Sequence, residues 1–167
     1  MPRCKLFAFI VVITLAFGVA IVADALAGEK FKLRTVKYMT KWEQVNVGDE
    51  EGHVIAVYEG KGIETNMQGK KFMDGWLIRE TGLMDINGKA GTWSAQGYGE
   101  STDRDGDKIF FSWEGRKDKN DAGKGTNAIL KGTGKWQGIK GKGTWVASPG
   151  VDNRWYSDVE LDLELPR

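Results

Sequence analysis

The sequence predicts an all-β domain, most simply an eight-stranded antiparallel up-and-down β-barrel. Polar and apolar residues alternate along several stretches after residue 28, which is typical of half-buried strands. The connections between these stretches have hairpin length and leave no room for crossover helices. Closing eight strands into a barrel removes the exposed edges of a flat sheet. A two-sheet β-sandwich is the alternative.

The first 27 residues are expected to be a cleaved secretory signal peptide. Arg3 and Lys5 precede an almost unbroken apolar run over 6–22, and Ala25-Leu26-Ala27 forms an Ala-x-Ala cleavage site. An uncleaved membrane anchor is the alternative, because the run approaches spanning length. Cleavage after Ala27 predicts a secreted or periplasmic protein with one domain over 28–167.

Composition narrows the classes of partner. The chain has 24 basic and 23 acidic residues and no charge run of the kind that binds nucleic acid or a membrane surface, so neither is expected as a partner after cleavage. The only cysteine is Cys4, within the predicted signal peptide, so the stability of the domain must come from packing rather than disulfides.

The first expected strands differ in the clarity of their alternation. In 36–44 one side carries Val36, Tyr38, Thr40, Trp42 and Gln44, and the other side carries Lys37, Met39, Lys41 and Glu43. The strand at 53–63 follows an acidic loop. The strand at 76–86 places Trp76, Ile78, Met84 and Ile86 on one face. Asn87-Gly88 predicts a hairpin into the strand at 92–102.

The second half continues the same pattern. An Asp-rich turn at 103–107 leads to alternation of Ile109, Phe111 and Trp113 with Phe110, Ser112 and Glu114. Further strands are expected at 125–130 and 142–148. The last strand, at 155–165, alternates most regularly and places one tryptophan and several branched residues on a single face.

A glycine-dense corner with the sequence GTGKWQGIKGKGTW occupies 132–145. Such glycines mark positive φ or close backbone approach, and Trp136 is expected to pack beneath the turn. A phosphate loop is not expected, because a strand rather than a helix follows. The residues assigned to this structural corner are Gly132, Gly134, Trp136, Gly138 and Gly141.

This corner resembles the turn of allene oxide cyclase-like and dirigent-like β-barrels, in which Gly-Thr-Gly-x-aromatic is followed by further glycines before the next strand. The resemblance is to uncharacterised bacterial secreted relatives of these families, and it covers about residues 103–145. It implies an eight-stranded barrel similar in outline to lipocalins and calycins, with an apolar central cavity, and it makes a homo-oligomer possible. The plant families cyclise a fatty-acid epoxide or direct the coupling of phenoxy radicals, but the matching segment places no catalytic residue on this chain.

Several kinds of chemistry lack the residues that they need. His53 is the only histidine, so a Ser-His-Asp or Cys-His arrangement would depend on it, and we expect it to be solvated beside the acidic loop. A zinc site of histidine and cysteine ligands is excluded. No phosphate-binding or dinucleotide-binding motif is present, so no cofactor is expected.

Calcium is the metal ion that the sequence pattern suggests most specifically. Asp103, Asp105, Asp107 and Glu114 occupy positions 1, 3, 5 and 12 of an EF-hand-like loop. However, Lys108 stands where that loop needs glycine, and an extended strand would carry Glu114 roughly 20 Å from the turn. We therefore expect a solvated Asp-rich turn and no metal.

The remaining candidates are aromatic and charged residues that could line the barrel, although alternation alone does not show which face lies inside. We expect a small apolar or aromatic ligand in the cavity; the alternatives are a cyclase-like or dirigent-like enzyme and an interaction module with a filled barrel. Two or more convergent charged groups in an open cavity would favour the enzyme. The candidate lining residues are Tyr38, Trp42, Tyr58, Trp76, Glu80, Tyr98, Glu100, Trp113 and Arg116.

Overall fold

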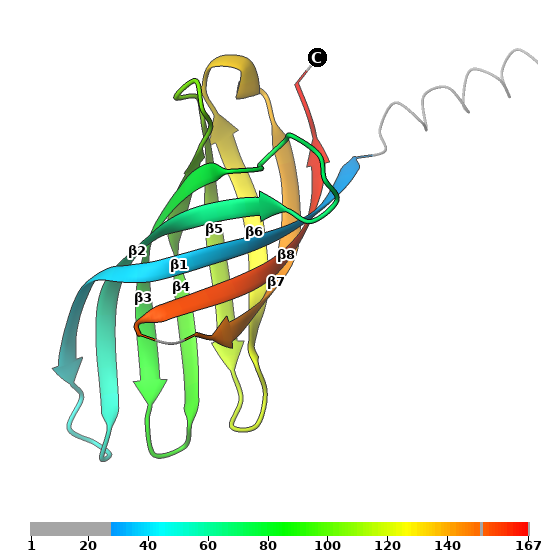
Figure 1. Ribbon diagram of the computed structural model, residues 1–167. Helices are drawn as coiled ribbons and strands as arrows, with labels where there is room; N and C mark the ends of the chain where they lie inside the picture. Colours follow the sequence, from blue (N-terminus) through cyan, green and yellow to red (C-terminus); the bar gives the residue numbers. More distant parts are fainter. Residues whose placement is uncertain (1–27, 151, 167) are drawn as a thin grey trace, which may run out of the picture.

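The computed structural model describes residues 28–150 and 152–166 and shows a closed antiparallel β-barrel (Figure 1). Each strand pairs with its neighbours in sequence, and the first strand pairs with the last. The barrel prediction is therefore confirmed, and the β-sandwich alternative is wrong. The predicted signal peptide lies outside the described residues. The strands are β1 (Glu29–Asn46), β2 (His53–Asn66), β3 (Trp76–Asn87), β4 (Thr92–Thr102), β5 (Lys108–Lys117), β6 (Gly123–Gly132), β7 (Lys140–Pro149) and β8 (Arg154–Glu164).

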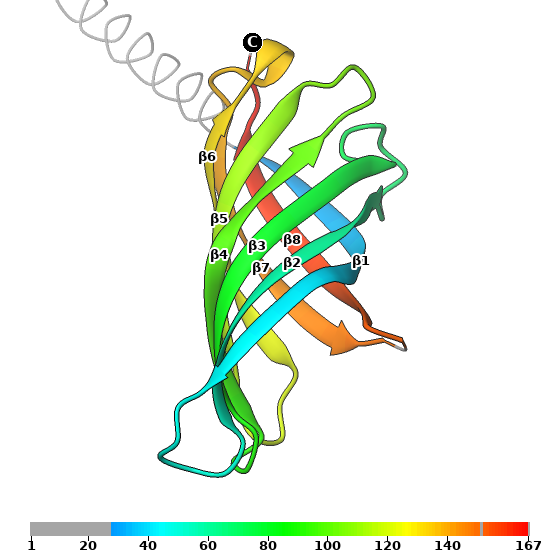
Figure 2. The ribbon, with the colours of Figure 1, turned by 90° about the vertical axis from the view of Figure 1, so that its left-hand side faces the viewer.

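The seam between β1 and β8 closes the barrel over only part of the length of β1. Pairing with β8 runs from Glu29, opposite Leu163, to Tyr38, opposite Arg154. A β-bulge then interrupts the pairing of β1 with β2 between Met39 and Lys41. Beyond this bulge the described residues pair β1 with β2 alone, and β1 and β2 continue past the turn between β7 and β8 (Figure 2).

One end of the barrel is filled by apolar side chains. Phe72 contacts Phe31, Trp76 and Trp136 with ring centroids 4.5, 5.3 and 5.1 Å away. These four aromatic residues, the aromatic plug, lie at the glycine corner, because Trp136 belongs to both. Buried aliphatic residues continue the packing below the plug, and they include Leu33, Ile78, Ile109, Ile139, Val159, Leu161 and Leu163.

The glycine corner forms a turn between β6 and β7. Its first part is a 3₁₀ turn (Gly134–Trp136), and Gly134 and Gly138 have φ values of 49° and 90°. Trp136 packs into the aromatic plug, and its Nε1 donates a hydrogen bond of 2.9 Å to Asp103 Oδ2. The corner therefore joins two turns at the same end of the barrel.

Asp103 is buried, so the prediction that the Asp-rich turn is solvated is wrong at this residue. Its Oδ1 accepts hydrogen bonds from the backbone N–H groups of Asp105 and Asp107, and Lys135 Nζ lies 2.7 Å from its Oδ2. Burial raises the pKa of Asp103, but the hydrogen bonds from Lys135, Trp136 and the two backbone groups outweigh burial and lower it to about 2. The Asp103 carboxylate therefore accepts the hydrogen bonds that hold the turn at 103–107 together.

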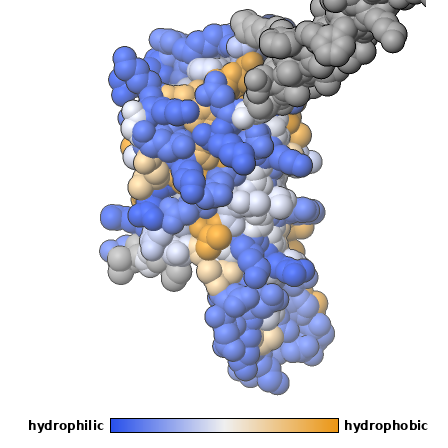
Figure 3. Space-filling view, turned by 90° about the vertical axis from the view of Figure 1, so that its right-hand side faces the viewer, coloured by the Kyte–Doolittle hydropathy of each residue, from blue (hydrophilic) through white to orange (hydrophobic). Residues whose placement is uncertain are grey.

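One face of the outer surface is mainly polar (Figure 3). The face shown in Figure 3 is largely hydrophilic, with scattered apolar groups. Cross-strand ion pairs lie on the outside of the seam, including Arg34 with Asp158 at 2.7 Å and Lys32 with Glu160 at 2.9 Å. In the described part of the chain, no helix is long and apolar enough to span a membrane.

Candidate functional site

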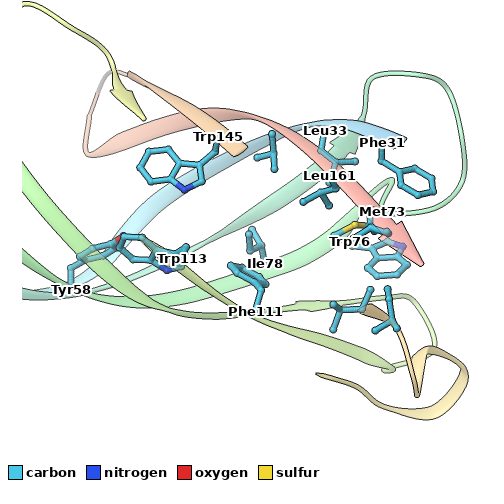
Figure 4. Close-up of a cluster of buried hydrophobic side chains, with 14 residues drawn as sticks. Phe31, Leu33, Tyr58, Met73, Trp76, Ile78, Phe111, Trp113, Trp145 and Leu161 are labelled. Carbon is cyan, nitrogen blue, oxygen red and sulfur yellow. The ribbon is translucent and has the colours of Figure 1, made fainter. Parts of the chain in front are cut away.

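A cavity of about 480 Å³ occupies the lumen below the plug. At the end away from the plug it is lined by residues of the loop between β5 and β6 and by the last part of β7, including Asp121, Ala122 and Ser148. Figure 4 shows Tyr58, Trp113 and Trp145 at one end of the buried cluster and Phe31, Met73 and Trp76 at the other. The large lining side chains are Leu33, Met39, Tyr58, Met73, Ile78, Met84, Trp93, Ile109, Phe111, Trp113, Ile129, Trp145, Trp155 and Leu161.

Glycines on neighbouring strands make room for the aromatic walls. Trp113 on β5 is paired with Gly97 on β4, and a Cβ atom at Gly97 would collide with the Trp113 ring. Trp145 on β7 is paired in the same way with Gly125 on β6. Each tryptophan ring therefore lies along the wall, over the glycine of the neighbouring strand. Because the ring does not project inward, the lumen stays open.

A buried ion pair crosses the wall of the lumen. Lys37 Nζ on β1 lies 2.9 Å from Glu80 Oε2 on β3, and the side chains are only 8% and 5% exposed. Lys37 is paired with Gly62 and Glu80 with Gly60, so the intervening strand β2 presents no side chain between them. The opposite charges compensate each other at a place where an isolated charge would be costly.

Tyr58 completes this group. Its hydroxyl donates a hydrogen bond of 3.0 Å to Glu80 Oε1. Burial, and then the neighbouring Glu80 carboxylate, raise the pKa of Tyr58 above its ordinary value. The phenol therefore keeps its proton and holds Glu80 in position. Lys37, Glu80 and Tyr58 together are called the lumen triad below.

A second carboxyl group, Glu64, lies in the same cavity wall. Its Oε1 accepts a hydrogen bond of 3.0 Å from Ser101 Oγ, whereas its buried Oε2 has no partner among the described residues. Burial raises the pKa of Glu64 to about 8, opposed by the Ser101 hydrogen bond and by the charge of Lys37. Glu64 is therefore mainly protonated at neutral pH and can exchange a proton near it.

Three of the predicted lining residues, Tyr58, Glu80 and Trp113, line the cavity. Trp76 is buried in the aromatic plug instead. Trp42 lies beyond the bulge, paired with Tyr58, and is 37% exposed. Its Nε1 donates a hydrogen bond to Gln44 Oε1.

The other predicted lining residues lie on the outer surface, so their expected position was wrong. Tyr38 and Tyr98 are 51% and 69% exposed, and Arg116 is also exposed. Glu100 forms an outer ion pair of 2.8 Å with Lys108. The physical reason is that their inward neighbours include lysine, serine and glycine, so the inner face is less apolar than alternation suggests.

Sequence reasoning missed several lumen residues, above all Lys37, Glu64, Ser101 and Trp145. Lys37 alternates with Val36 and Tyr38, so the alternation predicts that Lys37 faces solvent. In the structure Lys37 faces the lumen. The available signal was the pairing of aromatics with glycines across strands, such as Trp113 with Gly97. That signal needs the strand register, which alternation does not provide.

His53 is a structural contact rather than a solvated side chain. Its ring nitrogens lie 2.6 Å from Asp49 Oδ1 and 3.0 Å from Asp85 Oδ1. Hydrogen bonding to Asp49, and then to Asp85, raises the pKa of His53. It ties the turn after β1 to β3, outside the residues that line the cavity. Within 28–150 and 152–166, no cluster of potential metal ligands is present.

The cavity combines apolar walls with a compensated ion pair and a protonated carboxyl group. Such a site can hold an apolar molecule and direct one polar group of it. Because the lumen contains open space, a fully packed barrel does not describe this protein. Comparison of the sequence with protein-family models and with curated proteins finds no match.

Proposed function

We propose that the protein binds a small, largely apolar ligand in the barrel lumen, with aromatic molecules as the best fit. The observation that carries the proposal is the cavity of about 480 Å³, whose walls include four tryptophans. Known ligand pockets span about 300–1,000 Å³ and are mostly apolar with a few placed polar groups. A ligand here would cover aromatic surface that otherwise faces empty space or water.

A matched pair of variants on β7 tests where the ligand binds. Ala147 lies on the inner face and lines the cavity, whereas the neighbouring Val146 is exposed on the outer face. We expect Ala147→Phe to weaken binding of a naphthalene probe at least about tenfold by filling the lumen, and Val146→Phe to leave it unchanged. Calorimetric titration measures both. Equal binding by the two variants would contradict a lumen site.

Native mass spectrometry of protein purified from its own source addresses the natural ligand. We expect a small molecule to remain bound under non-denaturing conditions and to be absent from the Ala147→Phe variant. Ligand-free wild-type protein, together with no probe binding by calorimetry, would overturn the proposal.

Catalysis is the second candidate function, and Glu64 is the observation that favours it. A carboxyl group with a pKa of about 8, in the same cavity wall as the Lys37–Glu80 ion pair, is suited to proton transfer. A cyclase-like or dirigent-like enzyme would need convergent groups of this kind to position a reactive intermediate. Binding remains the first proposal because Lys37 and Glu80 compensate each other and Glu64 is mainly uncharged at neutral pH. If the bound molecule is turned over, Glu64→Gln should abolish turnover and retain binding. Retained turnover in this variant would contradict a role for Glu64.

We also propose that the protein is exported, because the basic start, apolar run and Ala25-Leu26-Ala27 site form a signal-peptide pattern. Terminal sequencing of the protein from its source should give a chain that begins at Gly28. A chain that keeps residues 1–27 would favour the membrane-anchor alternative.

A further inference from the structure

The charges of the lumen triad cancel, and this limits which ligands fit beside it. The ammonium group of Lys37 is paired with Glu80, and Glu64 is mainly protonated at neutral pH because its pKa is about 8. At the open end, Asp121 pairs with Lys124 at 3.3 Å, whereas Lys117 donates to the neutral carbonyl oxygen of Gly91 and keeps its positive charge. Deeper in the lumen, beside the lumen triad, an ionised ligand would find no free counter-charge from the residues that the structure describes.

An anion and a cation would each meet a specific penalty. A ligand carboxylate could reach Lys37 only by displacing Glu80, which would leave that buried carboxylate without its ammonium partner. A cationic ligand near the aromatic walls would be repelled by Lys37, whose Nζ already lies 5.5 Å from the centre of the Trp155 ring. Uncharged ligands avoid both penalties.

Hydrogen-bond donors are in excess in this wall. An ammonium group has three hydrogens, and in the described residues Lys37 Nζ uses one of them, in its bond to Glu80. Trp113 also lines the cavity, and its buried Nε1–H has no acceptor among the described residues. Unpaired buried donors are rarer in proteins than carbonyl oxygens with a free lone pair. Glu64 Oε2, which has no partner in the part of the chain that the structure describes, carries a proton at neutral pH and is a further donor, so this wall is short of acceptors.

We infer that the lumen selects uncharged ligands that carry a hydrogen-bond acceptor oxygen, such as the carbonyl of an aromatic ketone, aldehyde or ester, and that Lys37 binds this oxygen. The inference rests on the proposed lumen site and adds the chemical class of its ligand. The apolar part of the ligand lies against the tryptophan walls. The Lys37 ammonium supplies a charge-assisted hydrogen bond without giving up Glu80.

Three probes with the same ring system test this selection by calorimetric titration at pH 7. They are naphthalene, with no polar group; 2-acetylnaphthalene, with a neutral carbonyl; and 2-naphthoate, with a charged carboxylate. We expect 2-acetylnaphthalene to bind at least about tenfold more tightly than either of the others, the effect of one hydrogen bond to a charged donor.

Paired substitutions show whether the preference comes from Lys37. Lys37→Met with Glu80→Gln removes the ammonium and leaves no uncompensated charge, so the cavity can keep its fold. The matched control is Lys108→Met with Glu100→Gln, which removes an outer ion pair of 2.8 Å. We expect the lumen double variant to prefer 2-acetylnaphthalene over naphthalene by less than about threefold, a ratio measured within the same variant. The control should keep the full preference.

The outcomes separate this inference from the proposed function. Equal binding of all three probes would overturn the selection of a neutral acceptor and leave the lumen site standing. Tightest binding of 2-naphthoate would overturn it in favour of an anion site. No binding of any probe would overturn both, and a full preference in the lumen double variant would exclude Lys37 as the donor.

Discussion

Lys37 and Glu80 form the one ion pair among the described residues in which both side chains are less than a tenth exposed. Removing one partner leaves the other charge buried without compensation. Lys37→Met alone should therefore lower the free energy of unfolding by about 3–5 kcal/mol. Adding Glu80→Gln should recover much of that loss, because the buried charge is gone. Urea denaturation of the single and double variants measures both effects, and equal losses would contradict the mechanism.

Glu64 predicts how stability depends on pH. Its folded-state pKa of about 8 lies above the ordinary value of 4.5, so the folded protein keeps a proton that the unfolded chain has lost. Between about pH 5 and 8, rising pH should lower the free energy of unfolding through this group by up to about 1.4 kcal/mol per unit. Above that range both states are ionised and the effect levels off.

The Glu64→Gln variant isolates this contribution. It should become more stable relative to the wild type as the pH rises through this window, and the two should differ least near pH 5. Denaturation curves taken at several pH values measure the difference. Curves that stay parallel from pH 5 to 8 would mean that the Glu64 carboxyl has an ordinary pKa in the folded protein.

At the scale of strands and turns, the regular elements could be predicted and the irregular ones could not. The alternation of β8 placed Val159 and Leu161 on one face, and the structure buries both. On β1 the same reasoning failed, because Lys37 is satisfied by Glu80 on another strand and the bulge after Met39 changes which residues face inward. Such long-range pairing and bulges leave no mark in the local pattern.

The glycine corner allows a matched test of a turn. Gly134 and Gly138 both have positive φ, but a Cβ atom at Gly134 would collide with the Asp107 carboxylate, whereas Gly138 has open space around it. Gly138→Ala should cost about 1 kcal/mol from backbone strain, and Gly134→Ala about 1–3 kcal/mol more. Denaturation measures the difference. Equal costs, or lost ligand binding with normal stability, would contradict a purely structural corner.

For the whole molecule, the number of strands and the absence of crossovers were enough to predict barrel closure, whereas the open lumen depended on details of register. Glycines opposite Trp113 and Trp145 keep space along the wall, and the aromatic plug fills only one end. Neither the cavity nor its polar group follows from composition, because both depend on which side chains face one another across strands.

The seam gives a prediction for the barrel as a whole. Residues 33–38 of β1 are paired with β2 and β8, whereas residues 41–46 are paired with β2 alone. Every second amide in 41–46 should therefore exchange with deuterium much faster than the amides of 33–38, because its N–H faces the unpaired edge. Residues 81–87 of β3 are the control, because they also lie at a strand end but are paired on both sides. Their amides should exchange slowly.

Hydrogen exchange followed by NMR resolves these amides individually. Fast exchange confined to 41–46 would show that the seam is open beside the unplugged end of the lumen, where a ligand can enter without breaking backbone pairs. Protection throughout 41–46 would contradict the open seam and would indicate that another chain pairs with this edge. A dependence of that protection on protein concentration would identify the other chain as a second copy of this protein.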